Sequence, residues 1–353
     1  MLSDMNDLSY VIEPHLPLID LHRHLDGNVR LETILDLGRQ NKLQLPAWDI
    51  EGLRPYVQVI GPQPGVMAFI SKFHWMLQIL VDYDACRRVA YENVEDAMRE
   101  GLDYIELRFS PWFMAEAHGL DPIGVVEAVC DGVESGQRDF GMRANIIGIL
   151  SRTYGTQNCW KELQALLSQR ERITALDLAG DEARFPASQF KDHFSIARQV
   201  GWSITVHAGE IAGPESIWRS LRDLGAQRIG HAVAAMQDRR LVDYLCEKKI
   251  GIECNLTSNV QTSTVADYLS HPVGQFLRDG LLATINTDDP GISGINLEYE
   301  YVVAAPAAGL DHAAIQQLQR NALEVAFLPA EEKQAIRAHR AISGNARWYL
   351  KSS

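Results

Sequence analysis

Histidines and carboxylates gather in four short segments, each at the end of a run that predicts a β-strand. The segments are LIDLHRHLDG (18–27), SITVHAGE (203–210), RIGHA (228–232) and TINTDDPG (284–291). Side chains alternate between the two faces of a strand, so His22 and His24 point to the same side with their Cα atoms roughly 6–7 Å apart. Two imidazoles at that spacing can bind one cation, which makes the first segment a candidate metal site.

The other segments supply the remaining groups that a hydrolytic metal centre needs. His207 is a third candidate imidazole ligand, and Asp288 is a candidate carboxylate ligand. Glu210 and His231 are candidate proton carriers. Three nitrogen ligands, one oxygen ligand and an open position are typical of a catalytic site, whereas a structural zinc site is closed by four protein ligands. One His-x-His pair arises easily by chance, but such residues at several strand ends favour one shared site.

Composition and charge narrow the class of protein and of partner. The 353 residues are 46% hydrophobic and carry a formal net charge of −13 without a basic stretch, which disfavours nucleic acids and anionic membranes and favours a neutral or cationic small molecule. Five scattered cysteines without CxxC spacing indicate reduced thiols. The first 14 residues do not resemble a signal peptide, and no apolar run is long enough for a membrane span. We expect a cytoplasmic protein, and the sequence leaves its oligomeric state open.

Eight β-rich runs alternate with helical segments, which predicts an α/β fold. The runs cover residues 18–25, 104–111, 143–150, 173–180, 202–210, 228–232, 251–258 and 282–290. Such alternation implies parallel strands with right-handed crossovers, and eight units favour a closed (β/α)₈ TIM barrel over an open sheet. We expect one domain over 1–353, with the barrel at about 16–292, a helical insertion at about 28–103 and C-terminal helices at about 293–353.

A closed barrel would bring the candidate residues together. Active sites of such barrels lie at the carboxyl ends of the strands, where the four segments fall. Closure is also what lets His22, in the first strand, share a metal with Asp288, after the last. Within the insertion, an apolar stripe at helical spacing (Phe69, Ile70, Phe73, Met76, Leu77 and Leu80) either packs on the barrel or overhangs the pocket, and both interpretations stay open.

The motifs HRHLDG, DLAGDE, HAGE, RIGH and NTDDP, in this order, resemble the adenosine/AMP deaminase family, a branch of the metal-dependent amidohydrolases. The resemblance runs from about residue 14 to the last helices. It implies hydrolytic deamination of adenosine and 2′-deoxyadenosine to inosine and 2′-deoxyinosine plus ammonia. It also implies one Zn²⁺ per subunit, which activates the attacking hydroxide, and a small nucleoside as the binding partner.

The resemblance assigns a role to each matching position. The residues that match zinc ligands are His22, His24, His207 and Asp288. Glu210 matches the proton donor, and His231 matches the residue that orients the hydroxide. The residues that match substrate contacts are Asp26 near the ribose, Gly180 and Asp289 near ring nitrogens, and His24, which also borders the nucleoside. We expect Asp289 to accept a hydrogen bond from the purine, and Asp177 to be an outer partner of a ligand histidine.

Two segments depart from the family pattern. Ala232 stands where Gly commonly follows the RIGH histidine, and ECNLTSN stands where a Cys-Pro-x-Ser-Asn run is common. Neither position is a candidate ligand. The departures therefore put the fit of the substrate in question more than the activity.

Several other functions compete with deamination of a nucleoside. Adenine deaminases typically read HLEG where this chain reads HLDG, and the shorter Asp26 leaves room for a ribose hydroxyl. Adenine and other 6-substituted purines remain alternative substrates, whereas AMP is disfavoured because no basic cluster lies near the motifs. A binuclear amidohydrolase would need a bridging Lys at the end of the fourth strand, and the cytidine-type deaminases need PCxxC; the sequence has neither. The alternative outside enzymes is a catalytically silent nucleoside-binding barrel.

Overall fold

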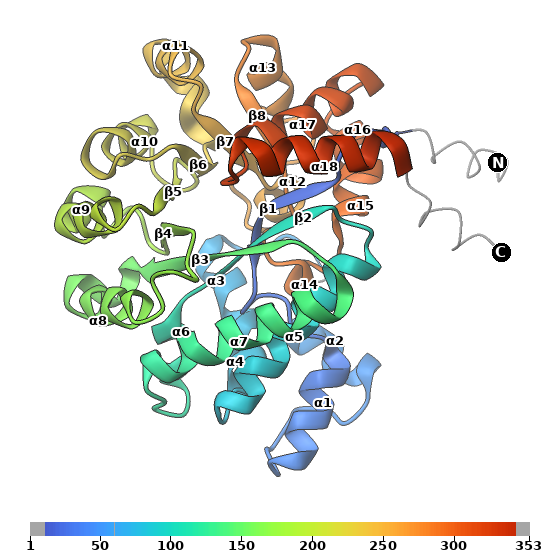
Figure 1. The fold of residues 1–353 in the computed structure, drawn as a ribbon, viewed down its shortest axis with the longest axis vertical. Helices are drawn as coiled ribbons and strands as arrows, with labels where there is room; N and C mark the ends of the chain where they lie inside the picture. The colour runs from blue at the N-terminus through green and yellow to red at the C-terminus, as the bar shows by residue number, and fades with distance from the viewer. Residues whose placement is uncertain (1–10, 60, 344–353) are drawn as a thin grey trace, which may run out of the picture.

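Eight parallel strands at the centre of the molecule form the barrel (Figure 1). The computed structural model describes residues 11–59 and 61–343. The strands are β1 (Ile19–His24), β2 (Tyr104–Phe109), β3 (Ala144–Ser151), β4 (Ala175–Ala179), β5 (Ser203–Ala208), β6 (Arg228–His231), β7 (Gly251–Cys254) and β8 (Leu282–Ile285). Each strand pairs with the next one along the chain, which confirms the predicted TIM barrel.

Helices surround the strands and bury the apolar side chains that point outward from the sheet (Figure 1). After β2 these are α6 (Pro111–Glu116), α7 (Pro122–Phe140), α8 (Gly155–Leu167), α9 (Lys191–Gln199), α10 (Pro214–Arg219), α11 (Arg239–Glu247), α12 (Leu256–Gln261) and α13 (Val273–Arg278). Short turns of 3₁₀ or π-helix join them: η3 (Arg152–Tyr154), η4 (Ala187–Phe190), η5 (Ser220–Leu224) and η6 (Val233–Gln237).

Two further groups of helices lie outside the regular strand–helix repeat. Between β1 and β2 the chain forms α1 (Leu31–Gln40), α2 (Ile50–Val57), α3 (Val66–Ile70), η2 (Ser71–Phe73), α4 (His74–Gln78) and α5 (Tyr83–Arg99). After β8 it forms α14 (Pro290–Ser293), α15 (Leu297–Tyr299), η7 (Glu300–Ala304), α16 (Ala305–Ala307), α17 (His312–Val325) and α18 (Ala330–Ser343). Of these, α17 packs on both β1 and β8.

Main-chain hydrogen bonds join β1 to the segment that follows β8 and nearly close the barrel. The Asp288 N–H donates to the His22 carbonyl over 2.8 Å, and the His24 N–H donates to the Asp288 carbonyl over 2.7 Å. Arg23 and Asp288 thereby form an isolated parallel bridge. We call this pair of hydrogen bonds the seam, because it joins residues that are far apart in the sequence.

A bulge in β1 turns its two histidines toward the inside of the barrel. Asp20 aligns with Ile105 of β2 and Arg23 aligns with Leu107, so β1 has one more residue than β2 between the two pairs. The extra residue reverses which side chains face outward. Asp20 and Arg23 both face the helices, where Arg23 binds Asp20 and Glu100.

Two predicted strands extend too far at their carboxyl ends. The run 251–258 is a strand only as far as Cys254, because the chain turns into α12 at Leu256. The run 282–290 ends as a strand at Ile285, and the following residues turn inward to the site. In the described part of the chain, no helix is both long and apolar enough to cross a bilayer. Two predictions fall partly outside the described residues. The absence of a signal peptide concerns residues 1–14, of which 1–10 are not described. The expected C-terminal helices extend to residue 353, of which 344–353 are not described.

Charged side chains fill the barrel interior beneath the carboxyl ends of the strands. Arg228 of β6 binds Glu106 of β2, and its Nε lies 2.6 Å from Glu253 Oε1 of β7. All three are essentially buried. The Phe327 ring covers the guanidinium at 3.6 Å from its centroid. A buried pair of this kind is costly to break, because the remaining partner becomes an uncompensated charge.

We therefore expect Arg228→Met to lower the free energy of unfolding by about 3–5 kcal/mol, measured by urea denaturation. The matched control is Arg239→Met, because Arg239 is exposed and its partners are the exposed Asp243 and the half-buried Asp279. That variant should change stability by less than about 1 kcal/mol. Equal effects of the two substitutions would contradict the assigned importance of the buried network.

Candidate metal centre and substrate cavity

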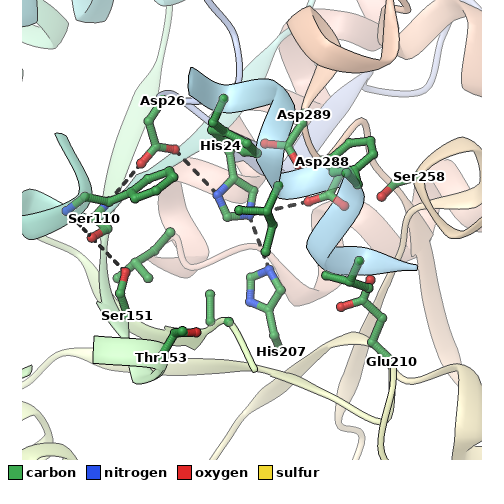
Figure 2. Close-up of a pocket in the computed structure, with 18 of the residues that line it drawn as sticks. His24, Asp26, Ser110, Ser151, Thr153, His207, Glu210, Ser258, Asp288 and Asp289 are labelled. Carbon is green, nitrogen blue, oxygen red and sulfur yellow. Dashed lines mark hydrogen bonds and ion pairs between the residues drawn. The ribbon is translucent and has the colours of Figure 1, made fainter. Parts of the chain in front are cut away.

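Four side chains converge on one point at the carboxyl end of the barrel, and Figure 2 shows three of them, His24, His207 and Asp288. His22 Nε2 lies 3.0 Å from His207 Nε2 and 3.1 Å from Asp288 Oδ1. His24 Nε2 lies 3.3 Å from His207 Nε2 and 3.4 Å from Asp288 Oδ1. Ligand atoms of a tetrahedral zinc ion are about 3.3 Å apart, given bonds of about 2.0–2.1 Å. The four predicted ligands therefore fit one metal ion.

Two buried carboxylates orient the ligand imidazoles from behind. His22 Nδ1 lies 2.7 Å from Glu253 Oε2, and His207 Nδ1 lies 3.0 Å from Asp177 Oδ2. Each Nδ1–H can donate to its carboxylate, which leaves the Nε2 lone pair for a metal. Asp177 thus lies where the sequence predicts an outer partner of a ligand histidine.

Arg108 of β2 connects these two carboxylates. Its Nη1 lies 2.8 Å from Asp177 Oδ2, and its Nη2 lies 3.0 Å from Glu253 Oε2. Burial alone would raise the pKa of both acids, but nearby charges outweigh it: His207 and Arg108 lower the pKa of Asp177, and Arg108 and Arg228 lower that of Glu253 well below its usual range. Both acids are therefore ionised acceptors.

The pKa of Glu210 is shifted in the opposite direction to those of Asp177 and Glu253. Its side chain is 12% exposed and lies 3.8 Å, through Oε2, from His231 Nε2. Burial raises the pKa of Glu210 to about 7, with Asp288 and Glu182 adding to the shift. A carboxyl with such a pKa is protonated in a useful fraction of molecules near neutral pH, as a general acid requires.

The loop that carries Glu210 is held by a second acid, Glu182. The Glu182 carboxylate accepts hydrogen bonds from five donors over 2.5–2.9 Å: the main-chain N–H groups of Gly209, Glu210, Ile211 and Ala212, and the Ser216 hydroxyl. This one side chain therefore fixes the main chain on both sides of Glu210.

His231 and Ala232 lie at the end of β6 in a left-handed turn. Their φ angles are 65° and 53°, a region that is unfavourable for residues with a Cβ. Glycine adopts it without strain, which is a physical reason for the Gly of the family pattern at the position where this chain has Ala232. The other departure reaches the site, because Asn255 Nδ2 lies 3.3 Å from His231 Nδ1.

A cavity of about 250 Å³ opens beside the ligands. Figure 2 shows Asp26, Ser110, Ser151 and Thr153 on one side of the two histidines, and Glu210, Ser258 and Asp289 on the other. Among the described residues, Asp26 Oδ1, Ser258 Oγ and Asp289 Oδ1 are buried polar atoms without a hydrogen-bond partner. Burial also raises the pKa of Asp289 well above its usual value. Unpaired polar atoms at both ends of a cavity suit an elongated polar guest.

Gly180 lines this cavity after β4 and has a φ of 106°. A Cβ there would lie 2.5 Å from Thr153 Oγ1, so only glycine fits. One wall is apolar and comes from Val66, Phe69, Ile70 and Phe73. Further along the predicted stripe, Met76 and Leu80 are buried in the core. Both interpretations of the stripe therefore hold, each for one part of it.

Sequence reasoning missed the residues that support the site from outside. They are Arg108, Glu253, Glu182, Asn259 and the hydrogen-bonded trio of buried Ser110 and Glu162 with half-buried Ser151. Two of them had a usable signal: Arg108 and Glu253 are charged residues in the middle of apolar strands, which indicates pairing in the interior. The others lie in loops, in helices or, for Ser151, at the end of β3, where polar residues are common.

The fold and the ligand set together are those of a metal-dependent hydrolase built on a barrel. The family model described as adenosine deaminase matches residues 17–340. A curated adenosine deaminase of Escherichia coli O1:K1 / APEC is 59% identical over 327 residues, which cover 93% of this chain and 98% of that protein. The chain belongs to the adenosine deaminase family.

Solved structures with the same fold include an adenine deaminase and an amidohydrolase. An adenine deaminase from Arthrobacter aurescens has a TM-score of 0.85 and 22% identity, and the match covers 96% of this chain and 100% of that one. An amidohydrolase from Burkholderia ambifaria with bound Zn has a TM-score of 0.84 and 20% identity, and covers 99% and 96%. At these identities the likeness shows the fold alone.

The geometry predicts that Asp288→Ala loses bound metal. Removing the oxygen ligand opens a set whose ligand atoms all lie within 4.8 Å of one another, so metal content after dialysis should fall to a small fraction of the wild-type value, as measured by elemental analysis. Asp289→Asn is the matched control. Asp289 is next to Asp288 in the sequence but is not in the ligand set, so this variant should keep its metal. A full metal content in Asp288→Ala would refute this ligand assignment.

Proposed function

We propose that this protein is a hydrolytic deaminase that converts adenosine and 2′-deoxyadenosine to inosine and 2′-deoxyinosine. In the reaction, water adds to the purine carbon that bears the amino group, the C–N bond breaks and ammonia leaves. The observation that carries the proposal is the grouping of a three-histidine, one-aspartate ligand set with a carboxyl of raised pKa in one cavity. Family membership supports the same substrate class.

We infer that His22, His24, His207 and Asp288 hold one Zn²⁺. Imidazole and carboxylate donors in an open four-ligand set suit zinc, and the amidohydrolase of the same fold is described with bound Zn. When bound, such an ion lowers the pKa of water to about 7 and thereby supplies a strong nucleophile near neutral pH.

Glu210 would supply the proton that the ring needs. Protonation of the ring nitrogen beside the amino-bearing carbon makes that carbon electrophilic, and a carboxyl with a pKa near 7 can give this proton. The Glu210 side chain faces the cavity beside His231 and Asp288. This proton stays on the ring nitrogen while the new C–O bond forms. The amino group takes up the hydrogen of the added hydroxyl and leaves as ammonia, and the carbonyl of the product forms.

Asp289 would bind the purine from the other side of the cavity. A ring nitrogen without hydrogen can only accept, so the carboxyl must donate, in contrast to the acceptor role expected from the sequence. The burial of Asp289 favours its neutral, donating form. Gly180 would let the base approach the main chain, because no side chain intervenes there.

Asp26 and its neighbours would bind the ribose. The Ser110 N–H donates to Asp26 Oδ2 over 3.2 Å. Asp26 Oδ1 lies 3.6 Å from His24 Nδ1 but makes no hydrogen bond, so it can accept one from a sugar hydroxyl. The Ser110 and Ser151 hydroxyls lie 2.8 Å apart on the same cavity wall. Among the described residues that line the cavity there is no Lys or Arg, so a substrate phosphate would lack a cationic partner.

The binding partner and the cellular location of the protein follow from the same site and from its cysteines. The partner is a small nucleoside, and the oligomeric state stays open. We propose a cytoplasmic location, because all five cysteines are unpaired and four of them are buried, as is usual for proteins of a reducing compartment.

A spectrophotometric assay of the metal-loaded protein tests the choice of substrate. We expect kcat/KM for adenosine and 2′-deoxyadenosine to exceed the values for adenine and AMP by roughly 100-fold or more, because a missing sugar leaves buried polar groups unpaired. The missing sugar applies to adenine; AMP keeps the sugar, but its phosphate would lie near Asp26 without a cationic partner. Faster turnover of adenine than of adenosine would overturn the nucleoside assignment in favour of the main alternative, an adenine deaminase.

Replacement of Glu210 by Gln tests the proton donor. The amide keeps the shape but cannot release the proton, so kcat should fall roughly 10²–10⁴-fold. Metal content should stay normal, because Glu210 is outside the ligand set. The control is Glu215→Gln, an exposed position on α10 with a surface partner, Arg219. A near-normal rate in the Glu210 variant would rule out its role as the acid.

A further inference from the structure

A chain of hydrogen bonds leads from a main-chain N–H to the back of His231. The Val273 N–H donates to His271 Nδ1 over 3.1 Å, and His271 Nε2 lies 3.2 Å from Asn259 Oδ1. Asn259 Nδ2 in turn lies 3.0 Å from His231 Nδ1. The three side chains are buried, with exposed fractions of 4% or less. We call His271 and Asn259 the relay.

The direction of every bond in this chain follows from its first member. A main-chain N–H can only donate, so Nδ1 of His271 accepts and the hydrogen of the neutral ring is on Nε2. That Nε2–H donates to Asn259 Oδ1, which assigns the other end of the amide, Nδ2, to His231. Because an amide nitrogen only donates, Nδ1 of His231 accepts.

Two further observations agree with this direction. Burial lowers the pKa of His271 to about 3, so the ring is neutral near neutral pH. Asn255 Nδ2 also lies closer to His231 Nδ1, at 3.3 Å, than to Nε2, at 3.5 Å. Two amide nitrogens thus approach the same ring nitrogen, and neither of them can accept a hydrogen from it.

We propose that His271 and Asn259 are positioning residues that fix His231 as the Nε2–H tautomer, with this hydrogen facing the reacting centre. His231 Nε2 lies 3.9 Å from Asp288 Oδ2 and 3.8 Å from Glu210 Oε2. The other tautomer would turn a bare lone pair toward these oxygens. The part of the inference that concerns catalysis rests on the proposed function, whereas the tautomer itself does not.

The tautomer can be read directly by NMR of zinc-loaded protein with ¹⁵N-labelled histidine. In the wild type we expect His231 to show an unprotonated Nδ1 and a protonated Nε2. In Asn259→Asp the carboxylate only accepts, so it should draw a hydrogen onto His231 Nδ1. In His271→Gln the side-chain amide can both accept from Val273 and donate to Asn259, so the wild-type tautomer should be kept.

Turnover of adenosine by the same proteins tests the consequence for catalysis. We expect Asn259→Asp to lower kcat roughly 10–100-fold, with little change in KM for adenosine and in metal content. His271→Leu should also lower kcat, whereas His271→Gln should retain most of the wild-type rate. His193→Gln is the matched control: this buried histidine stacks on Trp160 in another part of the molecule, and its replacement should leave kcat unchanged.

The possible results distinguish a failure of the proposed His231 tautomer from a failure of the proposed deaminase activity. A protonated Nδ1 on wild-type His231 would overturn the proposal even if no variant folds, and so would an unchanged tautomer and kcat in Asn259→Asp. If the expected tautomers appear but the wild type does not deaminate adenosine, the relay stands and the proposed function fails.

Discussion

The seam between β1 and the segment after β8 is the constraint on which the site depends. Its hydrogen bonds join the Asp288 main chain to His22 and His24, so one local geometry sets the distance from the carboxylate to two imidazoles. The bulge in β1 then turns these imidazoles inward. Because the seam uses main-chain atoms, it sets the positions of the backbone from which the three ligand side chains extend.

Two buried glutamates near the metal site have pKa values shifted in opposite directions. Glu253 and Glu210 are both buried acids, yet the pKa of Glu253 is lowered and that of Glu210 is raised. The difference comes from Arg108 and Arg228, which face Glu253, whereas Glu210 lies near the negative Asp288 and Glu182. The barrel thus separates a permanently ionised acid beneath the ligands from a proton-holding acid above them, a division that acid–base chemistry in one pocket needs.

The barrel and the inner residues of the site could be predicted from the sequence, because chemically distinctive residues recur at strand ends and strand–helix alternation is regular. The bulge could not be predicted: a one-residue shift reverses the faces of a strand without changing its composition. His271 and Asn259 were also missed, since each is an ordinary polar residue whose partner is distant in sequence or in another element. The end of β7 was misplaced because Asn255 and the residues after it serve the site, while their composition still resembles a strand.

The long separation in sequence between the metal ligands also has a consequence for biosynthesis. His22 lies in the first strand, and Asp288 follows 266 positions later in the sequence. This separation corresponds to roughly tens of seconds at ordinary translation speeds. A nascent chain therefore displays a pair of imidazoles long before the fourth donor exists, and the complete coordination sphere can form only after the last strand docks. A complete ligand set for the metal therefore arises only late in the maturation of the chain.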